Sequence, residues 1–181
     1  PSWLLCAMRI LVTGSSGRVG RAIYVRLSRD HEVVGLDKSP SSTSGFIGNI
    51  SDLPLLRKPL HTIDSVIHAA ALHAPPVGLS GDSEFESINV QATRMLAECS
   101  AESGVGKIVF TSTTALYCAA STPVWKAGWV NEVLEPQPET IYHKTKIAAQ
   151  TYLEAFSRQR SIPITVIGMS RCFPEPAPII A

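Results

Sequence analysis

The sequence predicts an α/β fold, a doubly wound parallel sheet with helices on both faces. Three observations favour this class. Short apolar runs of strand length alternate with longer segments of helical periodicity, a glycine-rich turn follows the first run, and an acidic residue ends the second. The five expected strands span residues 9–13, 32–36, 64–70, 107–111 and 163–169. The expected helices span residues 18–29, 83–103 and 140–160.

The amino-terminal elements follow from apolar runs and their breakers. RILVT, residues 9–13, is a short apolar run that ends in glycines, which is typical of a buried strand. The next segment places Val19, Ala22, Ile23 and Leu27 at helical spacing. EVVGL forms the second strand, and the Ser-, Gly- and Pro-rich residues 38–48 predict a loop.

The later elements repeat this alternation. Residues 83–103 carry apolar side chains at helical intervals until Gly104 and Gly106 end the helix. Residues 119–139 hold three prolines and form a connection long enough to be functional. Right-handed crossovers then favour the strand order 3-2-1-4-5 of the Rossmann type, in which ligands bind beyond the carboxyl ends of the strands.

Composition predicts one domain. The chain has 181 residues, 45% of them hydrophobic, and a formal net charge of +1, which gives no reason to expect a nucleic acid or an acidic membrane as partner. We expect the domain to span residues 8–181, with residues 1–7 as an extension before a natural start at Met8. No apolar run approaches the roughly 18 residues of a membrane span. The four cysteines have no disulfide or zinc spacing and predict reduced thiols in a cytoplasmic protein.

The turn T-G-S-S-G-R-V-G predicts a dinucleotide site. Gly14, Gly17 and Gly20 lie between a strand and a helix, where glycine permits a tight turn and lets backbone N–H groups approach a pyrophosphate. Asp37 ends the second strand and can accept hydrogen bonds from ribose hydroxyls, which favours NAD over NADP, although the adjacent Lys38 could soften that preference. The alternatives are a purely structural turn and a carboxylate that caps a strand end.

Tyr142 and Lys146 predict a proton-transfer site. Their spacing of four residues places them on one face of a helix, where a lysine ammonium would lower the pKa of a tyrosine. The hydroxyls of residues 111–114 follow the fourth strand, at the edge where a substrate would bind, although they could instead cap the strand. His68, in an apolar strand, is interpreted as a buried core residue, and no third ligand near it or His73 suggests a metal.

Several motifs together resemble the extended short-chain dehydrogenase/reductases, the NAD-dependent epimerase/dehydratase family. Residues 13–20 resemble its TGxxGxxG turn, 48–52 its GDxxD segment, 66–71 its cofactor-side strand, 89–93 the start of its N-V-x-G-T helix, 109–117 its F-x-S-S-x-x-x-Y stretch, and 142–146 its Y-x-x-x-K pair. The resemblance implies an active-site hydroxyl on Thr113, with Ser112 just before it. It implies cofactor contacts from Gly14, Ser16, Gly17, Arg18, Val19, Gly20, Asp37, Lys38, Asn49, Ile50, Ala69, Ala70, Ala71, Asn89, Tyr142 and Lys146.

Two departures from the family's sequence pattern bear on which substrate we expect. Pro174 stands in R-C-F-P where many nucleotide-sugar members carry the asparagine of R-Y-F-N. The sequence ends at Ala181, where members continue into a substrate-binding region, so we expect most of that region to be absent. The hypothesis is an NAD-dependent epimerase, dehydratase or oxidoreductase acting on a small molecule, with Tyr142 as acid/base, and a homodimer through the helices near 83–103 and 140–160. The alternatives are a dinucleotide-sensing or scaffold protein and a cofactor-binding form without turnover.

Overall fold

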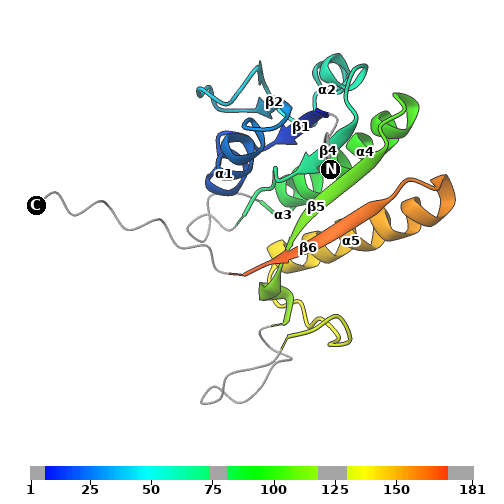
Figure 1. Cartoon of the computed structure of the whole chain (residues 1–181). Helices are drawn as coiled ribbons and strands as arrows, with labels where there is room; N and C mark the ends of the chain where they lie inside the picture. The colour runs from blue at the N-terminus through cyan, green and yellow to red at the C-terminus, as the bar shows by residue number, and fades with distance from the viewer. Residues whose placement is uncertain (1–6, 74–80, 118–129, 171–181) are drawn as a thin grey trace, which may run out of the picture.

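The computed structural model describes residues 7–73, 81–117 and 130–170, and these form one twisted parallel sheet with helices packed on it (Figure 1). The strands are β1 (Arg9–Thr13), β2 (Glu32–Asp37), β3 (Phe46–Ile47), β4 (Ser65–His68), β5 (Lys107–Thr113) and β6 (Ile164–Met169). Their order is β3-β2-β1-β4-β5-β6, and every pair is parallel. The expected Rossmann-type parallel sheet is confirmed. Its order 3-2-1-4-5 holds when β3, which was not expected, is counted as the third strand, and the strands expected at 64–70, 107–111 and 163–169 are then β4, β5 and β6.

The outer strand β3 comes from a segment expected to be loop. Residues 38–45 pack so closely on β2 that a Cβ on Gly35 would lie 1.7 Å from the Thr43 carbonyl oxygen. The Thr43 hydroxyl also donates to the Ser15 carbonyl at 2.7 Å, which ties this segment to the glycine-rich turn. The two residues of β3 are too few to give a periodicity signal, and the expected strand at 64–70 is therefore β4, beside β1.

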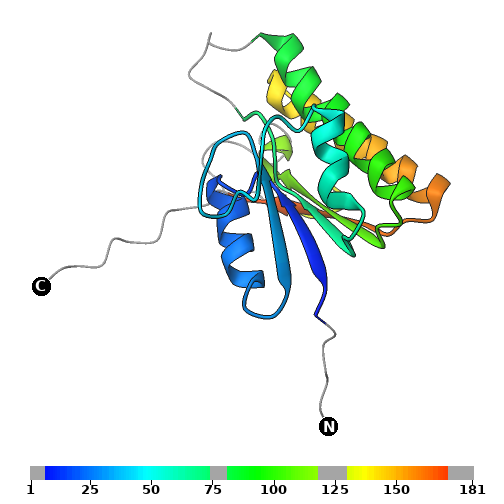
Figure 2. The same ribbon diagram turned by 90° about the horizontal axis from the view of Figure 1, so that it is seen from above.

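The helices divide between the two faces of the sheet. They are α1 (Arg18–Leu27), α2 (Leu53–Leu60), α3 (Asp82–Phe85), α4 (Ala92–Glu102) and α5 (Ile141–Arg160). Figure 2 shows α1 on one face and α2, α4 and α5 on the other. Sequence reasoning missed α2, whose Pro54 and Pro59 discourage a helix. Pro54 lies in the first turn, where it costs no hydrogen bond, and the Asp52 carboxylate caps the helix by accepting from Leu55 N at 3.1 Å.

The helix expected over 83–103 has a π-helical turn inside it. Residues Glu86–Gln91 (η1) have the wider winding and join α3 to α4. A π turn shifts the side chains that follow it round the helix, and such turns are often found at functional sites. Here it carries Asn89 into the protein interior, with 2% of its surface exposed.

The core lies between the sheet and the helices α2, α4 and α5. Leu11, Val66, Ile108 and Phe110 come from the central strands. Leu56 and Leu60 come from α2, Leu96 and Ala97 from α4, and Ala149, Leu153 and Phe156 from α5. Burial of this apolar surface is what holds the strand ends, and the groups that follow them, in fixed positions.

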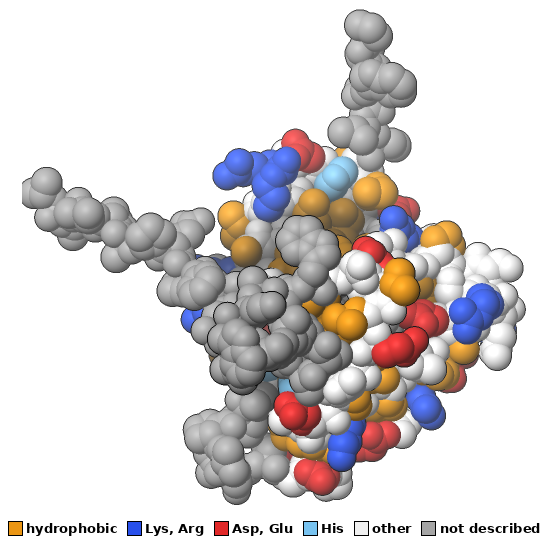
Figure 3. Space-filling view, turned by 90° about the horizontal axis from the view of Figure 1, so that it is seen from below, with side chains coloured by type: hydrophobic (Ala, Val, Ile, Leu, Met, Phe, Trp, Pro, Cys, Tyr) orange, Lys and Arg blue, Asp and Glu red, His pale blue; other side chains and the backbone are white. Residues whose placement is uncertain are grey.

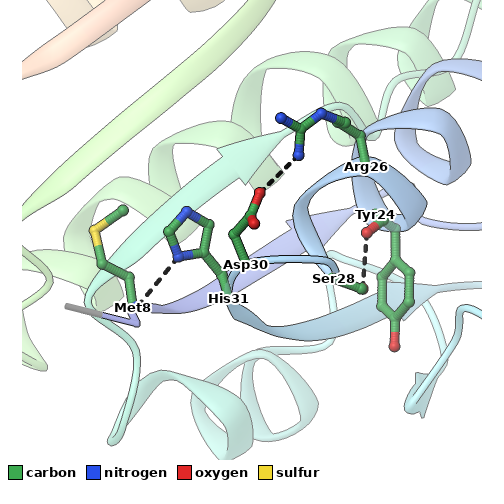
Figure 4. A network of polar contacts seen from close by, with 6 residues as sticks. All are labelled: Met8, Tyr24, Arg26, Ser28, Asp30 and His31. Atoms are coloured by element: carbon green, nitrogen blue, oxygen red, sulfur yellow. Dashed lines mark hydrogen bonds and ion pairs between the residues drawn. The ribbon is translucent and has the colours of Figure 1, made fainter. Parts of the chain in front are cut away.

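The corner between α1 and β2 is held by local polar contacts at the end of α1 opposite to the glycine-rich turn (Figure 4). Arg26 pairs with Asp30 at 2.8 Å, and the Ser28 hydroxyl donates to the Tyr24 carbonyl at 2.8 Å. Met8 N donates to His31 Nδ1 at 3.4 Å. Arg26, in the last turn of α1, is thus engaged in a solvent-exposed ion pair.

The surface carries charges of both signs. Figure 3 shows acidic and basic side chains scattered among apolar ones on the described part of one face, in keeping with the net charge of +1. Within the part of the chain that the structure describes, no helix combines the length and apolar character needed to cross a membrane.

Candidate active site

A large cavity of about 770 Å³ opens at the carboxyl ends of β1, β2 and β4. Its lining contains Gly14, Ser16, Gly17, Arg18, Val19, Gly20, Asp37, Lys38, Asn49, Ile50, Ala69, Ala70 and Ala71. These residues come from four separate segments of the chain. The structure therefore brings together thirteen of the residues that the sequence assigned to the cofactor.

The glycines are required by contacts within the protein. Gly14 has φ +72°, and a Cβ on it would lie 2.7 Å from Ala70 N on β4's continuation. A Cβ on Gly20 would lie only 2.0 Å from the Gly14 carbonyl oxygen, so the first turn of α1 could not close on β1. At Gly17 a Cβ would lie 3.3 Å from the same oxygen, and this position is exposed. The turn thus presents bare backbone at the amino terminus of α1, which suits a pyrophosphate.

Asp37 connects the turn to the end of β2. One carboxylate oxygen accepts from Ser16 N and the other from Ser39 N, each at 2.9 Å. The side chain is half-buried at the cavity wall. These two bonds fix the carboxylate in place, where lone pairs beyond those used by the amides can still accept from a ligand hydroxyl.

Sequence reasoning missed six lining residues. They are Leu36, Ser39, Leu72, His73, Glu84 and Ile88. Leu36 and Ser39 flank Asp37, and Leu72 and His73 directly follow the small residues of 69–71, so proximity in sequence to predicted residues was the signal available. Glu84 and Ile88 come from α3 and η1, and only the path of the chain places them here.

A second cavity of about 200 Å³ contains the proposed proton-transfer residues. Thr111, Ser112 and Thr113 from β5 line it together with Tyr142 and Lys146 from α5. Val19, Ala69, Ala71 and His73 line this cavity and the larger one. The two cavities are therefore adjacent, with a shared wall made mostly of small side chains.

Lys146 is buried beneath this cavity, with 2% of its surface exposed. Its Nζ donates to the Thr111 carbonyl oxygen at 2.6 Å and lies 4.1 Å from the centre of the Phe110 ring. Burial lowers the pKa of Lys146 from 10.5 to about 7, because a charged amine loses water there. A buried, perturbed lysine in a cavity is typical of a functional site.

Tyr142 does not have the lowered pKa expected from its spacing to Lys146. Burial raises its pKa above 10.0, and the hydrogen bond with the Thr113 side chain lowers it by less. The ammonium that was expected to stabilise a phenolate instead donates to the Thr111 carbonyl. Spacing in sequence places the two side chains on one face but does not show which acceptor the lysine selects.

The two neighbouring hydroxyls of β5 line the same cavity but have different partners on α5. The Ser112 hydroxyl donates to Gln150 Oε1 at 3.1 Å. The Thr113 side chain lies near enough to Tyr142 to lower its pKa, and its Oγ1 accepts from Ala115 N at 3.1 Å. Thr113 is therefore the hydroxyl that the structure brings to Tyr142.

The comparisons with known proteins agree with this geometry. A family model described as the NAD dependent epimerase/dehydratase family matches residues 10–174. The chain belongs to this family. It is 26% identical over 186 residues to a mouse dTDP-D-glucose 4,6-dehydratase, covering 92% of this chain and 51% of the dehydratase.

Solved structures of epimerase/dehydratase type share its fold. A short-chain dehydrogenase/reductase superfamily protein from Agrobacterium tumefaciens with bound NAD has TM-score 0.78 and 26% identity, over 88% of this chain and 48% of the other. Thermus thermophilus UDP-glucose 4-epimerase in complex with NAD has TM-score 0.77 and 25% identity, over 89% and 54%. The chain spans about half the length of these relatives.

Two further expectations drawn from the family resemblance concern Asn89 and Pro174. Asn89 is not among the residues lining either cavity, because its amide bonds Leu72 N and Leu72 O at 2.7 and 2.9 Å. The departure at Pro174 lies outside the described residues. His68, as expected, is a buried residue with both ring nitrogens hydrogen-bonded.

Proposed function

We propose that this member of the epimerase/dehydratase family binds NAD and transfers hydride to or from an alcohol or carbonyl carbon. The glycine-rich turn and Asp37 hold the dinucleotide, and Tyr142, Lys146 and Thr113 act on the substrate oxygen. NAD supplies the hydride acceptor and donor when bound. The observation that carries the proposal is the shared wall, because it lets one extended ligand reach from the turn to Tyr142.

The roles of the side chains follow from their protonation. With its pKa raised, Tyr142 keeps its proton at neutral pH and can donate it from Oη to a substrate oxygen that gains negative charge. In the reverse direction Tyr142 must first lose that proton, which a charged Lys146 would favour. Thr113 can orient the same oxygen because its side chain lines the same cavity as Tyr142 and lies near the phenol.

Asp37 supports NAD over NADP, because its carboxylate would attract ribose hydroxyls and repel a 2′-phosphate. Calorimetric titration with both cofactors tests this. Tighter binding of NAD is expected, with Asp37→Asn reducing the difference and Lys38→Ala enlarging it. Binding of NADP as tight as that of NAD would refute the preference.

Sugar nucleotides are the proposed substrates, since the relatives include a dTDP-D-glucose 4,6-dehydratase and a UDP-glucose 4-epimerase. The test incubates the protein with NAD and either dTDP-glucose or UDP-glucose, and follows NADH absorbance and the sugar products. Turnover that Tyr142→Phe abolishes supports the proposal. NAD binding without turnover of any sugar nucleotide would favour the dinucleotide-sensing alternative.

We also propose a homodimer through α4 and α5. The apolar side chains expected at this surface are Ile88, Met95, Leu96, Ile147, Tyr152 and Phe156. Leu96 and Phe156 are 1% and 5% exposed and belong to the core of their own chain, which leaves the half-buried Ile88, Met95, Ile147 and Tyr152 for a partner. Light scattering at micromolar concentration should give the mass of two chains, and the mass of one chain would contradict the proposal.

A further inference from the structure

A series of buried polar side chains connects the glycine-rich turn to α5, behind the walls of both cavities. Thr13, His68, Thr93, Asn89 and Thr145 are each 2% exposed or less. They come from β1, β4, α4, η1 and α5 in that order. Consecutive members are joined by hydrogen bonds, and the chemistry of the groups fixes which atom donates in each bond.

Thr93 fixes the direction at the centre of the series. Its hydroxyl donates to the Asn89 carbonyl oxygen at 2.7 Å. A threonine hydroxyl has one proton, so toward His68 it can only accept, and the bond of 2.8 Å to His68 Nε2 requires the proton to be on the ring. His68 therefore carries its proton on Nε2.

The other ring nitrogen fixes the arm that reaches the turn. Burial, with the charge of Lys146 as a smaller cause, lowers the pKa of His68 to about 3, so the ring is neutral and Nδ1 is an acceptor. The Thr13 hydroxyl, 2.7 Å away, must donate to it. Its oxygen can then accept from Ala70 N at 3.3 Å. Ala70 is the residue that lies against Gly14.

Asn89 extends the series to α5. Its Oδ1 accepts from Leu72 N, and its Nδ2 donates to Leu72 O and to Thr145 Oγ1, the last at 3.1 Å. The Thr145 hydroxyl has one proton and donates it in turn to the carbonyl oxygen of Ile141, at 2.9 Å, or to that of Tyr142, at 3.1 Å. The chain of bonds thus ends on the first turn of α5, at the backbone of the proposed acid/base residue or of the residue before it.

We propose that this directed hydrogen-bond series, with His68 as its Nε2–H tautomer, is a positioning device that holds the walls of the two cavities in register. Ala70 and Leu72 line the larger cavity, and Tyr142 lines the smaller one. His68 touches none of the reacting atoms and is a positioning residue. The part of the proposal that concerns cofactor affinity rests on the proposed function, and the part that concerns the tautomer does not.

Thr93 offers a matched pair of variants that tests the coupling. Thr93→Ser keeps the hydroxyl, whereas Thr93→Val keeps the shape and removes both the acceptor for His68 Nε2–H and the donor to Asn89. Without that acceptor, a proton on Nδ1 would be accepted by Thr13, and the Thr13 hydroxyl would lose its own acceptor. A change at Thr93 should therefore weaken the hydrogen bond of the Ala70 amide to Thr13, on the far side of the imidazole.

The measurement uses the cofactor-free protein. Long-range nitrogen–proton NMR correlations should show Nε2–H in wild type and Thr93→Ser, and loss of the pure Nε2–H state in Thr93→Val. Exchange of the Ala70 amide should rise roughly two- to tenfold in Thr93→Val and stay unchanged in Thr93→Ser. The exchange rate of the Leu153 amide, in the core, is the reference for global destabilisation.

Three results would overturn the proposal: an Nδ1–H tautomer in wild type, an Ala70 exchange rate unaffected by Thr93→Val, or an increase no larger than that at Leu153. The wild-type tautomer decides the matter even where Thr93→Val does not fold. Titration with NAD then tests the part of the proposal that concerns cofactor affinity. Several-fold weaker binding is expected for Thr93→Val but not for Thr93→Ser. If wild type does not bind NAD, the proposed function fails while the tautomer and exchange results stand.

Discussion

The glycine-rich turn and the Tyr142–Lys146 pair line two adjacent cavities but are built in different ways. The turn depends on missing side chains, since a Cβ on Gly14 or Gly20 would collide with neighbouring backbone. The pair depends on side chains that the fold buries at a cost, as the pKa of about 7 for Lys146 shows. The first region is specified by steric exclusion over a few consecutive residues. The second is specified by solvation and by partners distant in sequence.

The largest expected effect is on catalysis at the second region. Tyr142→Phe removes the only atom proposed to carry the proton, so turnover should fall by about 10²–10⁴-fold. Affinity for NAD should stay nearly unchanged, because the phenol acts on the substrate oxygen. Steady-state kinetics and calorimetry on the same preparation check both. Retained turnover would remove Tyr142 from the mechanism.

Lys146 should make stability depend on pH. Its folded pKa is near 7 and its ordinary value is 10.5, so between these values the unfolded chain binds more protons than the folded one. Stability from this group therefore rises with pH across that window, by up to about 1.4 kcal/mol per unit, and its full cost is present below pH 7. Urea unfolding of wild type and Lys146→Met at pH 6 to 9 measures the slope, which should be shallower in the variant. Equal slopes would mean that Lys146 is not desolvated.

Two glycine variants test steric exclusion in the turn. Gly20→Ala places a methyl 2.0 Å from the Gly14 carbonyl oxygen, and we expect a loss of about 1–3 kcal/mol of stability. Gly17→Ala is the matched control, because its methyl would lie 3.3 Å from that oxygen at an exposed position. Urea unfolding should therefore give a clearly lower free energy of unfolding for Gly20→Ala than for Gly17→Ala. Equal stabilities would contradict the account of the turn.

The smallest expected effect separates the neighbouring hydroxyls of β5. Thr113→Val removes the side-chain oxygen that lies near Tyr142 and should lower turnover clearly. Ser112→Ala removes a bond to Gln150 and should change turnover only a few-fold. The ratio of the two turnover losses is the measurement, and a larger loss in Ser112→Ala would reverse the assignment.

The two regions also differ in what the sequence could predict. The turn was found in full because its requirements are local: Gly14, Gly17 and Gly20 are close in sequence and each acts through its backbone. The direction of the Tyr142 pKa was missed, because it depends on burial and on the competition of the Thr111 carbonyl for Lys146. The role of Asn89 was missed for a related reason, since only the π-helical turn directs it to Leu72.

The elements of the fold show the same limit. Long periodic segments such as α5 were predicted, with Thr140 capping it by accepting from His143 N at 3.2 Å. Two short elements were not: β3 has two residues, and α2 contains two prolines. Both depend on tertiary packing, which overrides weak local propensity.

The central claim is that one NAD molecule spans both regions. It is tested most directly by titrating isotope-labelled protein with NAD and following backbone amide shifts. The account predicts that amides of the turn, of residues 69–71 and of the segment around Tyr142 and Lys146 all move, with one dissociation constant. Shifts confined to the turn, or two different dissociation constants, would contradict it.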